Sequence, residues 1–179
     1  HPPDQFTGKI EDRERNMKRR VVVTGVGALT PVGNDVATMW ESQLKCRNGV
    51  GAITHFDASR FPTKFAAEVR DYDFESQVED PKRFVDAGRN VRFAIGAARQ
   101  AVEDSGIHAN PKFNPARFGV YLGAGEGQQN FLQFMSLVTE AWRDGKVDLK
   151  NFTESFICRM NPRFELELEP NMPAAHLSS

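Results

Sequence analysis

A short apolar run followed at once by glycines constrains this chain more than any other segment: Arg19-Arg20-Val21-Val22-Val23-Thr24-Gly25-Val26-Gly27-Ala28-Leu29-Thr30-Pro31-Val32-Gly33-Asn34. Three valines after a basic pair suit a buried strand, and the glycines indicate a tight, side-chain-free exit. A strand followed by glycines often cradles a phosphate, so a nucleotide site is the first hypothesis. The dinucleotide fingerprint requires a third glycine where Thr30 stands, and no Gly-Lys-Ser/Thr closes a phosphate loop. The pattern therefore disfavours a cofactor loop.

The same stretch resembles the amino terminus of the β-ketoacyl-acyl carrier protein synthases, the thiolase-fold condensing enzymes of fatty acid and polyketide synthesis. Other segments resemble the family in the same order along the chain. They are Gly49–Ile53, Phe56–Ser59, Phe61–Val69, Ala101–Gly106, Gly119–Gly127 and Asn171–Leu177. The resemblance covers residues 18–179, and the ordered set is more specific than any one segment.

This resemblance implies an α/β fold with the layered αβαβα architecture of the thiolases. Residues 17–179 are expected to be the amino-terminal half of a condensing-enzyme domain with a mixed sheet, truncated before the strand that carries the nucleophile. Met17 looks like a natural start, so residues 1–16 are interpreted as a disordered extension or a cloning remnant. Without the remaining strands of that sheet, the strands at 21–23 and 118–122 would have no neighbouring strands to cover their apolar edges.

Local patterns predict the individual elements. Asn34 and Asp35 can cap a helix to about Cys46, ended by Asn48-Gly49. Apolar residues at helical spacing predict a long helix over 82–104, which Gly106 stops. The alternation at 164–169 predicts a half-buried edge strand with three glutamates on its solvent face, or an acidic rim that faces a partner. The other expected elements are strands at 21–23, 65–69 and 118–122 and a helix at 128–142.

Composition bounds the class of protein. The 179 residues suit one domain, and a net charge of −1 gives no sign of a nucleic-acid surface. No apolar run approaches the roughly 20 residues that a membrane helix needs. The first sixteen residues do not resemble a signal peptide, and two cysteines without a pairing framework fit a reducing compartment. We expect a cytoplasmic location.

The family chemistry is a decarboxylative Claisen condensation, in which a cysteine thiolate takes an acyl group and two histidines assist decarboxylation of a malonyl thioester. The resemblance places that cysteine and both histidine motifs beyond Ser179, so no catalytic residue is assigned within this chain. Cys46 ends a predicted helix and Cys158 lies in a divergent connection, 143–170, without a nucleophile elbow. Both cysteines are interpreted as structural.

The histidines carry no chemistry of their own in the sequence. His1, His55 and His108 lie at a terminus, before a turn and after a helix stop, and no pair has metal-ligand spacing. His176 lies in the recognisable motif, where packing or a backbone hydrogen bond is the expected role. The acidic residues form no convincing acid/base pair, and no metal is expected.

One functional surface is predicted. Lys82 and Arg83 precede the long helix where similar synthases place basic residues that receive the acidic carrier protein, and Arg89 and Arg92 are weaker candidates. The alternative is an ordinary solvated helix start. Glycines 123, 125 and 127 are expected to form a tight turn instead of a ligand site.

The resemblance therefore implies an elongating 3-oxoacyl-ACP synthase, an acyltransferase whose complete chain is a homodimer. Its partners would be the acyl carrier protein and acyl and malonyl thioesters. No bound cofactor is implied, because phosphopantetheine arrives on the carrier protein. This piece alone is expected to be inactive. The alternative is a non-catalytic partner subunit or interaction fragment of the same fold.

Overall fold

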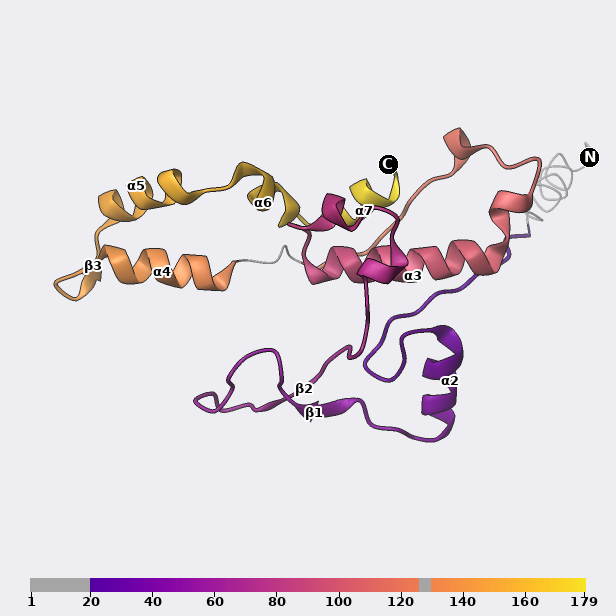
Figure 1. Ribbon diagram of the computed structural model, residues 1–179, viewed down its shortest axis with the longest axis horizontal. Coiled ribbons are helices and arrows are strands. Elements are labelled where there is room, and N and C mark those ends of the chain that lie inside the picture. The colour runs from indigo at the N-terminus through magenta and orange to yellow at the C-terminus, as the bar shows by residue number, and fades with distance from the viewer. Residues whose placement is uncertain (1–19, 126–129) are drawn as a thin grey trace, which may run out of the picture.

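The computed structural model describes residues 20–125 and 130–179, and a long central helix organises them (Figure 1). The longer helices are α2 (Val36–Leu44), α3 (Arg89–Ser105), α4 (Phe131–Ala141) and α5 (Leu149–Arg159). The short helices are α6 (Pro162–Glu167), α7 (Met172–Leu177) and the 3₁₀ turns η1 (Glu75–Gln77), η2 (Pro81–Phe84), η3 (Ile107–Ala109) and η4 (Pro115–Arg117). The strands are β1 (Val50–Ala52), β2 (Phe65–Ala67), β3 (Trp142–Arg143) and β4 (Lys146–Val147).

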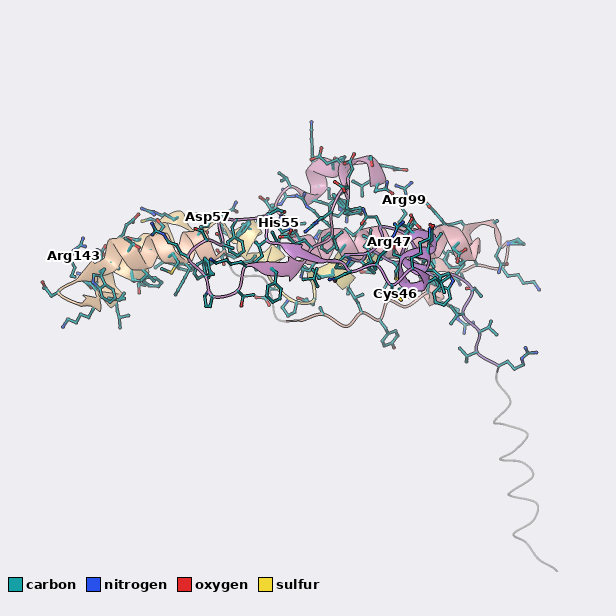
Figure 2. All side chains as sticks on the ribbon, turned by 90° about the horizontal axis from the view of Figure 1, so that it is seen from below. Cys46, Arg47, His55, Asp57, Arg99 and Arg143 are labelled. Carbon is teal, nitrogen blue, oxygen red and sulfur yellow. The ribbon has the colours of Figure 1, made fainter. Side chains whose placement is uncertain are left out.

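Helix α3 lies at the centre, with α7 packed along it and the β1–β2 hairpin and α2 on the opposite side (Figure 1). The buried cluster comprises Phe74, Phe84, Ala87 and Val91, so it joins η2 to the first turns of α3. Met172 of α7 packs against this cluster. The antiparallel pair α4 and α5 extends past the end of α3, with Arg143 at the tip of this arm (Figure 2).

The glycines of the first segment serve helix packing. A Cβ on Gly25 would lie 2.1 Å from the carbonyl oxygen of Ala101, and one on Gly27 would lie 1.9 Å from that of Ala97. The backbone N–H of Val26 donates to Asp104 at 2.9 Å, and that of Ala28 donates to Gln100 at 3.1 Å. The absence of side chains therefore lets residues 25–28 lie directly on the backbone of α3, and no phosphate is needed to explain these glycines.

Two predicted strands are wrong. Residues 21–23 and 118–122 are not paired, and Val21 and Tyr121 are 93% and 99% exposed. Within the described residues the only sheets are two-stranded and antiparallel, β1 with β2 and β3 with β4, so the mixed sheet is not formed there. A strand is stable only when a neighbour accepts its hydrogen bonds, and these segments have no such neighbour.

The helix ends follow local chemistry. The Asp35 side chain accepts the Thr38 N–H at 2.7 Å and caps α2, as predicted. Cys46, in the left-handed conformation with φ 49°, follows the end of α2 at Leu44, so the helix ends before the predicted Asn48-Gly49. Gly106 has φ 60° and ends α3, as predicted.

The long helix predicted over 82–104 is interrupted near its start. Asp80 accepts the Lys82 N–H at 3.2 Å and begins η2, and Gly88 then provides the extended N-cap of α3. Phe84, Ala87 and Val91 share one buried cluster. Their spacing is that of one helix face, so a continuous helix would also align them. The break coincides with Gly88, a residue type of low helix propensity.

The predicted edge strand at 164–169 is also wrong. Asn161 accepts the N–H groups of Arg163 and Phe164, Pro162 occupies the first turn, and α6 forms instead. Glu167 is 6% exposed whereas Glu169 is exposed, so the glutamates do not share one solvated face. This also contradicts the alternative of an acidic rim.

Candidate functional site

Lys82 and Arg83 lie on the 3₁₀ turn η2, and both side chains are exposed. The turn begins with the Asp80 cap and Pro81, whose fixed φ suits a first helical position. Phe84 is 8% exposed and anchors the end of the turn in the core. A buried aromatic next to two cations therefore fixes them on one outward face.

The surroundings of the two cations differ. The Arg83 guanidinium lies over the Phe84 ring, 5.6 Å from its centroid, and donates to the hydroxyl of Ser179. Lys82 borders an open hollow of about 460 Å³ whose wall includes Phe74 and Val85. Arg83 is consequently held in place, while Lys82 extends beside an apolar depression.

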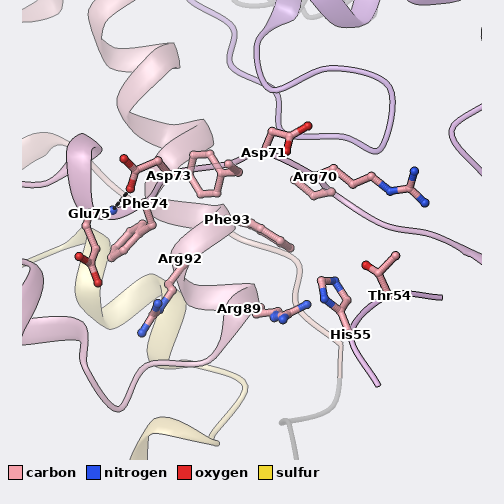
Figure 3. Close-up of a pocket in the computed structure, with 12 residues that line it drawn as sticks. Thr54, His55, Arg70, Asp71, Asp73, Phe74, Glu75, Arg89, Arg92 and Phe93 are labelled. Carbon is pink, nitrogen blue, oxygen red and sulfur yellow. Dashed lines mark hydrogen bonds between the residues drawn. The ribbon is translucent and has the colours of Figure 1, made fainter. Parts of the chain in front are cut away.

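The two weaker candidates have separate roles. Arg92 donates to the carbonyl oxygens of Ala87 at 3.2 Å, Phe84 at 3.2 Å and Val85 at 3.4 Å, so its guanidinium is committed to holding the backbone after η2. Arg89 is exposed at the start of α3 and is directed toward His55 (Figure 3). Of these two arginines, only Arg89 therefore makes no hydrogen bond to a backbone carbonyl among the described residues.

Arg89 and His55 line an open cleft of about 560 Å³ between the hairpin and α3 (Figure 3). Arg70, Asp71, Asp73 and Glu75 also line this cleft, together with Tyr72 and Phe93. Cations and carboxylates are mixed along its walls. The Tyr72 hydroxyl packs against Gly96 of α3, in the space that a Cβ at that position would need. Burial raises the pKa of Tyr72.

A buried carboxylate, Glu68, closes the hairpin beside this cleft. It accepts the backbone N–H of Thr54 at 3.0 Å and the Thr54 hydroxyl at 2.9 Å. His55 and Arg70 lie 3.8 and 3.9 Å from its oxygens. The Thr54 N–H is the largest cause that holds the pKa of Glu68 below its usual value, and the hydroxyl and His55 add to it. We assign Glu68 a structural role, since its oxygens are already occupied.

Neither cysteine has the surroundings of a nucleophile. Cys46 follows α2, Cys158 lies in the last turn of α5, and both are exposed free thiols. The carbonyl end of a helix disfavours negative charge. Cys46 and His55 are well separated (Figure 2), and no cluster of three potential metal ligands occurs in residues 20–125 and 130–179. Gly123 and Gly125 face open space, and Gly127 lies outside the described residues.

Sequence reasoning missed one pair of titratable residues. The ring nitrogen Nε2 of His176 lies 2.8 Å from Oε2 of Glu167, and the two side chains are 9% and 7% exposed. The imidazole also packs on Phe84, with ring centroids 5.2 Å apart. Packing was the expected role of His176, but its hydrogen-bond partner is a carboxylate. The strand predicted at 164–169 had placed Glu167 in water, which concealed the pair.

The described residues thus form a helical layer around α3, and solved ketosynthase structures share this fold. The ishigamide ketosynthase/chain length factor superposes with a TM-score of 0.62 at 23% identity, over 89% of this chain and 36% of that one. A β-ketoacyl synthase from Burkholderia phymatum gives a TM-score of 0.62 at 21% identity, again over 89% and 36%. A type II polyketide ketosynthase in complex with its acyl-carrier protein gives 0.59 at 22% identity, over 90% and 38%. These likenesses define the thiolase-like ketosynthase fold.

The family model described as β-ketoacyl synthase, N-terminal domain, matches residues 18–178, so the chain belongs to the β-ketoacyl synthase family. A 3-oxoacyl-[acyl-carrier-protein] synthase 2 of Coxiella burnetii is 47% identical over 116 residues, which are 65% of this chain and 28% of that protein. The synthase 2 of Synechocystis is 40% identical over 116 residues, 65% of this chain and 27% of that protein. The aligned portion is thus little more than a quarter of each relative's length.

Within residues 20–125 and 130–179, none of the helices combines the length and apolarity needed to cross a membrane.

Proposed function

We propose that the protein to which this chain contributes is a 3-oxoacyl-acyl carrier protein synthase, an acyltransferase of fatty acid or polyketide synthesis. In the proposed reaction an enzyme thiolate first attacks the carbonyl of one acyl carrier thioester, which forms the acyl-enzyme and releases the free thiol of that carrier. The malonyl carrier thioester then loses CO₂, and its carbanion attacks the acyl-enzyme carbonyl. The products are a β-ketoacyl carrier thioester, CO₂ and the free enzyme thiol. The observation that carries this proposal is the family match over residues 18–178.

Within that reaction, the proposed role of this chain is to receive the carrier protein at Lys82 and Arg83. Exposed cations on a rigid turn suit an acidic protein surface and the phosphate of phosphopantetheine. A solved neighbour described as a ketosynthase in complex with its acyl-carrier protein supports this choice of partner. We further propose a homodimer in the cytoplasm, without a resident cofactor, because phosphopantetheine is delivered on the carrier.

A non-catalytic partner subunit of the same fold is the second candidate. Cys46 and Cys158 are exposed and lie outside any histidine or metal-ligand cluster among the described residues, which fits this candidate as well as the first. Such a subunit would bind carrier protein or a synthase without forming an acyl-enzyme. The two candidates share the docking surface and differ in whether an acyl group becomes attached to the protein.

Carrier binding is tested by fluorescence anisotropy of a labelled bacterial holo-acyl carrier protein titrated with this chain. Reversal of both cations, Lys82→Glu with Arg83→Glu, should weaken binding about tenfold or more, because four charge units change at the contact. Lys112→Glu with Arg117→Glu is the matched control, since it makes the same four-unit change at two exposed residues, one just before η4 and one on it. Equal binding by the double variant and the parent chain would exclude this docking site.

Catalysis is tested separately by mass spectrometry of the thioester products. This chain, incubated with acyl and malonyl carrier thioesters, should form no β-ketoacyl product. A protein of this family that contains the chain and a nucleophile cysteine should become acylated. Absence of acylation in that longer protein would favour the partner-subunit candidate.

A further inference from the structure

The cationic turn η2 is held on two sides. Arg92 of α3 binds the carbonyl oxygens of Phe84 and Val85. From the other side Arg163 of α6 donates to the carbonyl oxygen of Arg83 at 3.3 Å and pairs with Asp86 at 3.4 Å. A 3₁₀ turn of four residues has little stability of its own, so its shape depends on these contacts.

The deepest of these contacts is aromatic. Phe84 lies between Phe74, at 5.5 Å between ring centroids, and His176 of α7, at 5.2 Å. Both neighbouring rings meet it edge-on, an arrangement that favours one ring orientation. The His176 imidazole therefore helps to hold the Phe84 ring, and Phe84 is bonded directly to Arg83.

His176 is in turn oriented by Glu167. The 2.8 Å contact between their side chains is buried, and each is less than a tenth exposed. Burying a carboxylate costs free energy unless it is hydrogen-bonded, and even a paired buried carboxylate adds little net stability. The Glu167–His176 pair is better explained by the fixed orientation that it gives to the two side chains. The pair connects α6 to α7, the segment from which His176 contacts the core.

We infer that Glu167 and His176 are positioning residues for carrier-protein binding: they act through Phe84 to hold Lys82 and Arg83 in the geometry that the carrier recognises. This inference rests on the docking function proposed above for the two cations. Neither positioning residue contacts the carrier, because both side chains are buried. Their effect on affinity is transmitted by the packed chain Glu167, His176, Phe84 and Arg83.

The test measures binding of holo-acyl carrier protein to this chain with Glu167→Gln and His176→Gln. Each substitution removes the charged or ring partner of the buried contact, and each should weaken binding about three- to tenfold. Glu169→Gln makes the same chemical change as Glu167→Gln on an exposed side chain two residues away, and should change affinity less than about twofold. Binding is measured at a temperature where circular dichroism shows every variant folded.

A merely structural role would give a different result. The two glutamine variants would then lower the unfolding midpoint and bind the carrier as the parent chain does, which would overturn the inference. Should either variant fail to fold, Phe84→Leu provides the second measurement. It keeps an apolar side chain beside Arg83 but loses the edge-on ring contact with His176. Unchanged affinity in Phe84→Leu would also overturn the inference.

The reversal variant separates this inference from the proposed function. If Lys82→Glu with Arg83→Glu leaves binding unchanged, the docking site itself is refuted. If that reversal abolishes binding while Glu167→Gln and His176→Gln leave it intact, docking stands and only the positioning role fails.

Discussion

The close contact of Gly27 with α3 leads to a quantitative prediction for Gly27→Ala. The added Cβ would lie 1.9 Å from the Ala97 carbonyl oxygen and 2.8 Å from the Ala101 nitrogen. Both are backbone atoms of a helix, so the segment around residue 27 must retreat by more than about 1 Å. Overpacking of this kind costs about 1–3 kcal/mol. Loss of the Ala28 bond to Gln100 adds about 1 kcal/mol. We expect a destabilisation of about 3 kcal/mol in all.

Urea unfolding followed by circular dichroism measures this change. With a slope of about 2 kcal/mol/M, the midpoint should fall by about 1.5 M. Gly123→Ala is the matched control, since a Cβ there meets nothing within 4 Å, and its midpoint should stay within about 0.3 M of the parent chain. If the two variants share one midpoint, residues 25–28 do not pack on α3 and the explanation of these glycines is refuted.

Two further predictions concern local stability. Asp35→Ala removes the carboxylate that accepts the Thr38 N–H, and should cost about 1 kcal/mol, whereas Asp35→Asn should retain most of the cap; urea midpoints of the two variants check this. Because Thr54 holds the pKa of Glu68 below its usual value of 4.5, Glu68 contributes stability above that pH and loses this stability as the pH falls through the lowered pKa. The unfolding midpoint should therefore fall less between about pH 5 and pH 3 in Glu68→Gln than in the parent chain, and parallel pH profiles would contradict the assignment.

The site was predictable where one short segment determined it. The Pro81-Lys82-Arg83 stretch indicated cations before the long helix, and these residues do lie exposed on η2, although their role in carrier binding stays a prediction. The Glu167–His176 pair was not predictable, because its two residues are nine positions apart and belong to two different helices, α6 and α7. The role of Arg92 was hidden for the same reason, since the carbonyl groups it binds become available only when η2 breaks from α3.

The sequence by itself determined the family, the cap at Asp35, the stop at Gly106 and the location of α2, α3 and α4, because each of these depends on contacts within a few residues or on an ordered set of motifs. Tertiary structure alone decided which segments could be strands and which acidic residue is buried. Residues 21–23 have strand composition, yet pairing requires a neighbour that the described residues do not supply. Residues 164–169 alternate as a strand would, but the Asn161 cap and the contact with His176 favour a helix that buries Glu167. Hydrogen-bond partners and burial are properties of the packed chain, so a local pattern can indicate them only when the partner is also local.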